Sequence, residues 1–250
     1  MRKEVFNETK FIQEIVAVFR SGLSRDQLLE KLHDYHENDI AQALTFLDKE
    51  ERIKLYQLFD TEWLSEIVTY WDEPEKYISE IGMEKLAAVV NEMDSDDAVD
   101  LLEKLDEKIK IKLRPILRED VKAAIRLIHS YDEEEIGSLM TNNYICINRR
   151  GNIRQAMRAL IRQAGEHDNI STIYVVDEEH KFCGAIDLKD LIIARENDDL
   201  DDLISYSYPY LMDHAVISES IEQSKDYAED SLPVLNSRRE IIGIITAQDI

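Results

Sequence analysis

The sequence predicts an α + α/β chain, in which an all-α array of short helices precedes a strand–turn–strand–helix unit that occurs twice. Three observations predict this architecture. Residues 173–191 and 232–250 align without a gap at an offset of 59. Apolar residues recur at helical spacing through the first half of the chain. Only Gly22 and Gly82, of seven glycines, precede residue 136. A helical front and a mixed α/β rear therefore meet near that residue.

The front is predicted to consist of short amphipathic helices, because apolar residues recur at positions i, i+3, i+4 and i+7. Helices of about ten residues with one apolar stripe are unstable alone, so they must stack as a superhelical array. Pro74 and Pro115 are expected at helix starts or in loops, since proline disrupts a helix interior. The predicted stripes are Ile40-Ala43-Leu44-Leu47, Leu64-Ile67-Val68-Trp71, Leu86-Val89-Val90-Met93, Ala98-Leu101-Leu102-Leu105 and Val121-Ala124-Ile125-Ile128.

The rear mixes strand and helix signals. Asn152 is the expected N-cap of a helix that Gly165 ends. The further elements expected are a strand over 172–176, a turn over 177–181, a strand over 182–186, a helix over 188–195, an acidic linker over 196–202 and a weakly signalled strand within 211–217.

The two copies of the repeat agree at positions that differ in chemistry. The alignment pairs Gly184 with Gly243 and Asp190 with Asp249. This unit resembles the cystathionine-β-synthase (CBS) module, which occurs in pairs that sense ligands and rarely do chemistry. The resemblance implies a tandem CBS-domain pair behind the helical array. The chain ends at Ile250, inside the opening turn of a helix, so the second module is expected to be truncated. The expected domains are a helical domain over 1–134, a first CBS module over 135–200 and a second over 201–250.

Charge and cysteine content limit the class of partner. Thirty basic against 53 acidic side chains leave a net charge of −23, which disfavours nucleic acid and favours cations or basic protein surfaces. Cys146 and Cys183 form no CxxC motif and fit a reducing compartment. The first residues are too charged for a signal peptide, and no apolar run approaches the 18 residues of a membrane span.

One predicted helix carries four acids along a single face, at Asp96, Asp100, Glu103 and Glu107. Like charges four residues apart cost a few tenths of a kcal/mol per pair, which the helix N-terminus offsets only for Asp96 and Asp97. The face is either a solvated surface or part of a cation site that another domain completes. Mg²⁺ suits the second interpretation, because it takes oxygen ligands and binds through one or two carboxylates. An EF-hand is excluded, since Val99 and Leu105 stand where Gly and Glu are needed.

Other candidate sites are weaker. His33 and His36 have helical spacing, but zinc would need further strong ligands, so a surface pair at a helix start is preferred. The acidic run 132–135 is interpreted as a solvated hinge. The chain contains no nucleotide-binding glycine motif and no nucleophile at a recognisable distance from a base, so it is not expected to be an enzyme.

Three segments in order, MDSDDAVDLLEKL (93–105), YDEEEIGSLMT (131–141) and IYVVDEEHKFCGAIDLKDL (173–191), resemble motifs of the MgtE family of magnesium channels and transporters. The resemblance implies an intracellular region at the cytoplasmic face of the membrane, with a membrane domain of the same protein following Ile250. It also implies a homodimer. In the family, Mg²⁺ bound by carboxylates between the domains favours a compact state and closes the pore.

The resemblance also implies a set of metal ligands. Acids matching Asp96 and Asp249 lie on either side of a bound ion in the family, and Asp100 and Glu66 map onto neighbouring positions. Asp97 is a further candidate from its place beside Asp96. The chain departs from the family at 247–249, where Ala-Gln-Asp replaces the usual pair of adjacent acids.

CBS pairs often bind adenosine nucleotides such as ATP, and this is the alternative function, a nucleotide-sensing module attached to another effector. Thr246 and Asp249 fit the pattern that contacts phosphate and ribose. Asp187 replaces the usual Ser or Thr in the first copy and would repel phosphate, so at most one nucleotide site is expected.

The homodimer is expected to form through the CBS modules. Their helices carry apolar residues, Leu191, Ile192 and Leu203, that we expect one chain to leave exposed.

Overall fold

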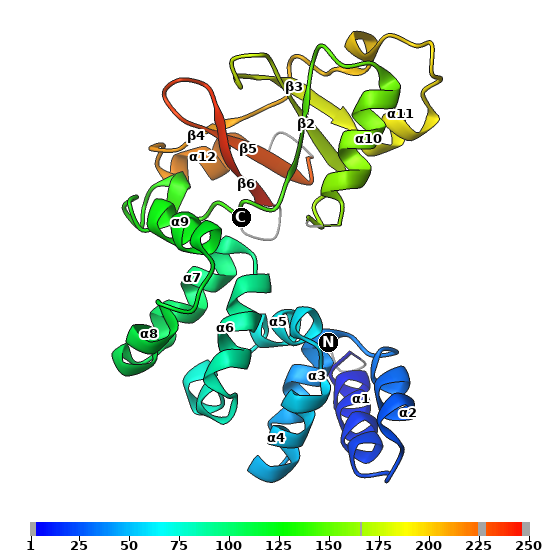
Figure 1. Cartoon of the computed structure of the whole chain (residues 1–250), viewed down its shortest axis with the longest axis vertical. Coiled ribbons are helices and arrows are strands. Elements are labelled where there is room, and N and C mark those ends of the chain that lie inside the picture. The colour runs from blue at the N-terminus through cyan, green and yellow to red at the C-terminus, as the bar shows by residue number, and fades with distance from the viewer. Residues whose placement is uncertain (1–3, 166, 225–228, 247–250) are drawn as a thin grey trace. The chain divides into compact units, whose positions relative to one another are not determined.

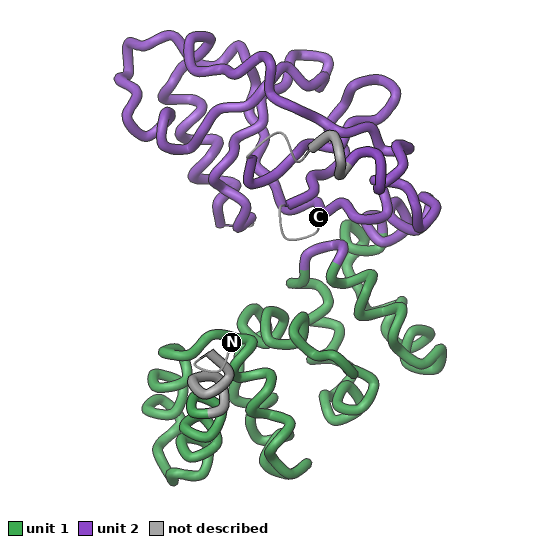
Figure 2. The backbone as a smooth tube through the Cα atoms, turned by 180° about the vertical axis from the view of Figure 1, so that it is seen from behind, with its two compact units in different colours: residues 1–93, 97–122 green, residues 94–96, 123–250 purple. Residues whose placement is uncertain are grey.

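The computed structural model describes residues 4–165, 167–224 and 229–246 (Figure 1). By its internal contacts the chain divides into two compact units. Unit 1 comprises residues 1–93 and 97–122, and unit 2 comprises residues 94–96 and 123–250 (Figure 2). Among the described residues, no helix combines the length and the apolar character that crossing a bilayer requires.

Short helices build the front of the chain, as predicted. Their starts are fixed locally, because Ser24, Asp48 and Asp60 each accept a hydrogen bond from a backbone N–H of the first turn. The helices are α1 (Glu4–Phe19), α2 (Arg25–Leu32), α3 (Glu37–Leu44), α4 (Lys49–Leu58), α5 (Thr61–Thr69), α6 (Met83–Glu92), α7 (Ser95–Lys104), α8 (Glu107–Leu113) and α9 (Glu119–Ile128), with 3-10 turns at Pro74–Lys76 and Ile78–Glu80.

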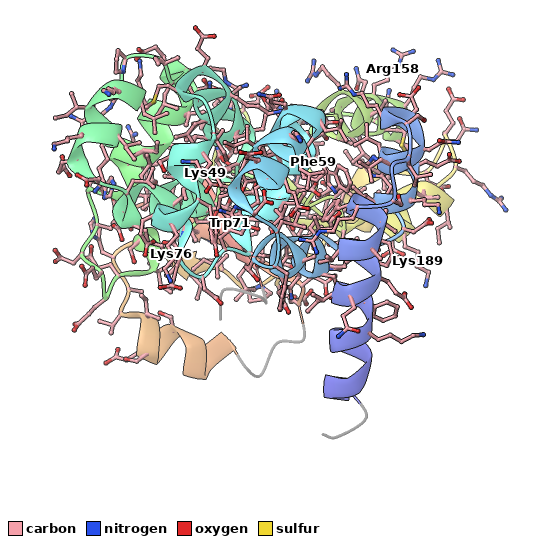
Figure 3. The ribbon with its side chains drawn as sticks, turned by 90° about the horizontal axis from the view of Figure 1, so that it is seen from below. Lys49, Phe59, Trp71, Lys76, Arg158 and Lys189 are labelled. Atoms are coloured by element: carbon pink, nitrogen blue, oxygen red, sulfur yellow. The ribbon has the colours of Figure 1, made fainter. Side chains whose placement is uncertain are left out.

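The predicted apolar stripes form the core of this helical array. Ile40, Leu64 and Val89 are fully buried, whereas Met93, Leu102, Ala124 and Ile125 are half-buried at the margins of their stripes. Phe59 and Trp71, both buried, lie among the helices (Figure 3). Pro74 begins a 3-10 turn and Pro115 lies in the turn after α8, so both prolines stand where they were predicted.

Unit 2 contains the repeated module twice. The first copy consists of β1 (Ile145–Asn148), α10 (Ile153–Gln163), β2 (Thr172–Val176), β3 (Phe182–Asp187) and α11 (Leu188–Ile193). The second consists of β4 (Leu211–Met212), α12 (Ile217–Ser224), β5 (Ser231–Leu235) and β6 (Ile241–Thr246). Single 3-10 turns lie at Ile136–Ser138 and Leu200–Leu203. Each copy has a three-stranded sheet in sequence order, with the first pair of strands parallel and the second antiparallel. The tandem pair and the fold class are therefore confirmed.

Residues that the sequence alignment pairs also occupy equivalent positions in the two sheets. Val175 lies opposite Gly184 and Val234 lies opposite Gly243, and each pair is followed by an irregularity of the ladder. Asn152 caps α10 as predicted. Its side chain accepts from Gln155 N and its own N–H donates to the Gln155 side chain, both at 3.0 Å.

Each module is entered by a segment that pairs with the last strand of the other module. Thr141 exchanges two backbone hydrogen bonds with Ile244 of β6, at 2.8 and 2.9 Å. Ser205 exchanges two with Ala185 of β3, at 2.8 and 3.3 Å. These two entry segments explain why the repeat carries a glycine. A Cβ added at Gly184 or at Gly243 would clash with the entry segment that pairs with that strand.

Side chains from both modules share one small core. Tyr174, Phe182, Leu235 and Ile244 are buried together, and the Tyr174 hydroxyl lies 2.6 Å from Ser231 Oγ. The two copies therefore stabilise each other, as expected of a unit whose apolar surface is covered by its own repeat.

The residues expected to be exposed for dimer formation require a correction. Leu191 is fully buried in the core of the first module, and Leu203 packs against the same core. The sequence interpretation was wrong for Leu191 because α11 turns this residue toward the sheet. Ile192 and Ile193 are the exposed residues, with 61% and 68% of their surface accessible.

Candidate functional site

Two of the predicted ligands in unit 1, Glu66 and Asp97, act electrostatically on Tyr70 at the end of α5. Glu66 is exposed on α5, and Asp97, half-buried, lies in the first turn of α7. Tyr70 is the C-terminal cap of α5, and both carboxylates affect the pKa of its hydroxyl. Burial raises the pKa of the Tyr70 hydroxyl, and the negative charges of Glu37, Asp97 and Glu66 raise it further. Glu37, Asp97 and Glu66 are therefore the group of carboxylates whose charge acts on the Tyr70 hydroxyl.

Glu37 is a member of this group that sequence reasoning missed. It lies in the first turn of α3, where Trp63 Nε1 donates a 3.2 Å hydrogen bond to its Oε1. The ring of His36, which caps α3, meets the ring of Tyr70 at a centroid distance of 5.6 Å. The only sequence signal for Glu37 was an acid after a helix cap, which is a common pattern for ordinary helix starts.

The start of α7 contacts the entry loop of the first CBS module. Asn142 N donates to Ser95 Oγ at 3.0 Å, and Asn143 Nδ2 donates to Asp94 Oδ2 at 3.0 Å. Asn143 is only 5% exposed, and its Oδ1 accepts from Asp168 N at 2.8 Å. Asp96, half-buried, belongs with Asp94 and Ser95 to unit 2. The polypeptide thus passes from one unit to the other between Asp96 and Asp97, two of the predicted ligands.

The predicted acidic face is shorter than the sequence indicated. Helix α7 ends at Lys104, and Glu107 begins α8 instead of continuing the face of Asp96. Asp106 is the cause, because its extended backbone starts the new helix and its carbonyl accepts from Ile109 N and Lys110 N. Asp100 is exposed on α7.

No group of three metal-ligating side chains close enough to hold an ion occurs within the described parts of the chain. Asp249, the predicted partner of Asp96, lies outside the described residues. The ligand set of Asp96, Asp97, Asp100, Glu66 and Asp249 therefore remains a prediction.

The two histidines of the weaker candidate site contact neighbouring groups of the helical domain. The His33 ring stacks on Trp63 with a centroid distance of 4.0 Å, and the His36 side chain accepts from Asn38 N at 3.1 Å. Both histidines are exposed, but only His36 lies at a helix start, whereas His33 caps the C-terminal end of α2.

Only one of the two residues predicted to bind a nucleotide lies within the described part of the chain. Thr246 is half-buried at the end of β6, and its companion Asp249 is outside the described residues. In the first module, Asp187 uses its carboxylate to cap α11 and accepts from Lys189 N at 2.7 Å. That role explains an acid at this position.

A polar depression of about 600 Å³ lies elsewhere on the first module, beside the turn of Arg149 to Gly151. Arg149 donates to both oxygens of Asp201 at 2.7 and 3.0 Å, and these bonds lower the pKa of Asp201 to about 2. Arg150 pairs with Glu178. Both arginines are thus paired, and the lining stays net acidic because it also contains Asp177, Glu179 and Asp199.

A stacked-helix domain followed by two mutually paired CBS modules defines a CBS-pair protein with a helical N-terminal domain. Residues 35–134 match the MgtE intracellular N domain, and residues 136–197 match the CBS domain. The chain is homologous to the MgtE magnesium transporters.

The chain is 25% identical over 248 residues to the magnesium transporter MgtE of Thermus thermophilus, and the match covers 97% of this chain and 55% of that protein. It thus spans about half the length of the curated relatives that it matches. The crystal structure of the soluble part of a magnesium transporter superposes with a TM-score of 0.88 at 24% identity, covering 97% of this chain and 96% of that one. The cytosolic domain of the Mg²⁺ channel MgtE, crystallised with ATP, gives 0.81 at 25% identity, covering 90% and 93%.

Proposed function

We propose that this chain is the magnesium-sensing regulatory region of a Mg²⁺ channel or transporter at the cytoplasmic face of the membrane. Mg²⁺ bound jointly by carboxylates of the helical domain and of the second CBS module favours a compact state that closes the pore of the membrane domain. The chain acts by binding and not as an enzyme, and it does not bind nucleic acid. The homology to magnesium transporters supports the attached pore.

The observation that carries this proposal is the match of residues 35–134 to the MgtE intracellular N domain, directly ahead of a match to the CBS domain. Glu37, Glu66 and Asp97 add negative charge to the helical domain, and carboxylate oxygens are ligands that Mg²⁺ prefers. The chain as a whole, at −23, raises the local concentration of cations further.

The physical mechanism follows from repulsion. Carboxylates on two domains repel each other, so the compact arrangement is unstable until a divalent ion neutralises them. The ion binds the compact state better than the open one, which is the requirement for shifting the equilibrium. Changing the ratio from 1:99 to 99:1 takes about 5.5 kcal/mol of differential binding, which several weak sites can supply together.

Small-angle scattering tests the proposal. Mg²⁺ is expected to reduce the radius of gyration and to slow proteolysis near residues 132–137, because ions hold the two domains together. NaCl at equal ionic strength is the control, since it screens charge without occupying a coordination site. If NaCl compacts the chain as well as MgCl₂ does, the effect is screening and the magnesium-sensing proposal fails.

A second function, sensing of an adenosine nucleotide, is favoured by two observations. A structural relative was crystallised with ATP, and Thr246 lies at the end of β6 as the nucleotide pattern requires. The same titration with metal-free ATP separates the functions, because a nucleotide sensor responds to ATP alone and a magnesium sensor to Mg²⁺ alone.

The assembly that we expect is a homodimer through the CBS modules. Ile192 and Ile193 expose apolar surface on α11 that a second copy could cover. Light scattering is expected to give twice the chain mass of 29.2 kDa, with and without Mg²⁺. A mass of one chain under both conditions, at micromolar concentration, would contradict the dimer.

A further inference from the structure

The connector that leads into the first CBS module is fastened to the second one. The connector comprises residues 131–138, between α9 and the entry segment. Ile136 N donates to Ala215 O at 2.9 Å and Gly137 N donates to Asp213 O at 2.8 Å. In return, Ile217 N donates to Glu134 O at 2.9 Å. The three bonds form antiparallel, strand-like pairing between two segments about eighty residues apart in the chain. We expect them to break and form together, as one cooperative unit.

A buried side-chain contact reinforces this pairing. The Tyr131 hydroxyl donates to Asp213 Oδ2 at 3.1 Å, and His214 N donates to Asp213 Oδ1 at 3.0 Å. Asp213 is only 6% exposed, so loss of either bond leaves a desolvated carboxylate oxygen. The Tyr131 ring lies directly on Gly137, where an added Cβ would come within 2.5 Å of the ring carbons. The close approach of ring and backbone requires glycine at this position.

An exposed ion pair forms a third tie. His214 Nδ1 lies 2.9 Å from Glu135 Oε1, and the His214 ring packs against Tyr131 at a centroid distance of 5.1 Å. The Glu135 pKa is lowered by the backbone N–H of Asp132 and then by His214. The His214 pKa is raised by its bond to Glu135, and Asp213 and Asp132 add to the effect.

We propose that this arrangement is a latch by which the second CBS module controls the connector, with Tyr131 and Asp213 as its positioning residues. The inference rests on the proposed function, because the ligand that operates the latch is the Mg²⁺ or nucleotide held by the second module. The latch segment, residues 213–217, directly follows β4, a strand of only two residues paired with β5. So short a strand is easily displaced, and a ligand that stabilises the second module closes the latch.

Amide hydrogen exchange tests the latch without any ligand. Gly137→Ala is expected to speed exchange at residues 136, 137 and 217 about tenfold, because the new methyl group displaces the Tyr131 ring. In a Tyr131→Ala background the same change should add little, since the ring is gone. Gly165→Ala is the matched control, because no described atom lies within 4 Å of its added Cβ. Equal effects of Gly137→Ala in both backgrounds would overturn the latch.

The pH dependence of the same exchange follows from the third tie. Because the His214 pKa is raised in the folded chain, protonated His214 stabilises the latch. This stabilisation is complete below pH 6.5, the ordinary histidine pKa, and is lost as pH rises through the pKa of folded His214. Because the Glu135 pKa is lowered in the folded chain, ionised Glu135 also stabilises the latch. This stabilisation is complete above pH 4.5, the ordinary glutamate pKa, and is lost as the pH falls through the pKa of folded Glu135. After correction for intrinsic exchange, protection is therefore expected to be greatest between pH 4.5 and 6.5. The His214→Gln variant should lose this maximum, and an unchanged profile would remove His214 from the latch.

Ligand coupling is the closing test. With saturating Mg²⁺ or ATP, exchange of the connector amides is expected to slow in the native chain and not in Tyr131→Phe or Asp213→Asn. Calorimetry should show that these variants still bind the ligand, and Tyr210→Phe, an exposed tyrosine of the same unit, should respond like the native chain. Binding without any change in connector exchange would overturn the latch and leave the proposed function intact. Absence of binding by the native chain would overturn both the proposed function and the ligand control of the latch.

Discussion

Asp96→Asn and Asp249→Asn are each expected to raise the Mg²⁺ concentration at the midpoint of compaction about tenfold. Each substitution removes one charged oxygen ligand, and a tenfold change corresponds to about 1.4 kcal/mol of binding free energy. Asparagine keeps the shape of the side chain, so the fold should be unaffected. The midpoint is measured by small-angle scattering during a Mg²⁺ titration. Glu30→Gln on α2 is the control, because it removes the same charge from an exposed position.

The double variant decides whether the two carboxylates share an ion. If they do, the first substitution already abolishes most of the shared coordination, and the combined effect is clearly less than the sum. Additive effects would show that Asp96 and Asp249 act at separate places, and the bridge between them would have to be abandoned. Intact sensing in the double variant would show that neither residue is a ligand of the sensing ion.

Gly184→Ala is expected to destabilise unit 2 by about 3 kcal/mol, the upper part of the usual range for overpacking a tight site. The added Cβ would lie 2.4 Å from the backbone carbonyl oxygen of Ser205, so the crossed entry segment itself must move. For Gly243→Ala, at the equivalent position, the three nearest atoms are Cβ, Cγ and Sδ of Met140, each at 2.9 Å. The Cγ and Sδ atoms can rotate away and only Met140 Cβ is fixed to the backbone, so the expected cost there is smaller, about 1 to 2 kcal/mol.

Urea unfolding followed by circular dichroism measures both costs, with Gly165→Ala again as the control. Equal losses for Gly184→Ala and Gly243→Ala would show that the entry segment over Gly184 is as yielding as a methionine side chain. Backbone crowding by the crossed segment would then not be the reason for glycine at position 184.

The sequence by itself determined the two architectures and their order. Helical periodicity is local, so stripes such as Leu64-Ile67-Val68-Trp71 could be identified without knowing their neighbours, and all four residues are buried. The internal repeat gave more structural information than helical periodicity did, because each copy limits how the other can be interpreted. It placed Gly184 and Gly243 at equivalent positions and, through the alignment of Val175 with Val234, specified one register for both sheets.

Only the tertiary structure decided which surfaces meet. Glu37 meets Trp63 because α3 packs against α5, and nothing in the local pattern of α3 encodes that neighbour. Leu191 became core and Ile192 surface through the direction in which α11 leaves β3. The pairing of Gly137 with Asp213 uses backbone groups, which every residue except proline carries alike, so the partner segment could not be identified from the sequence.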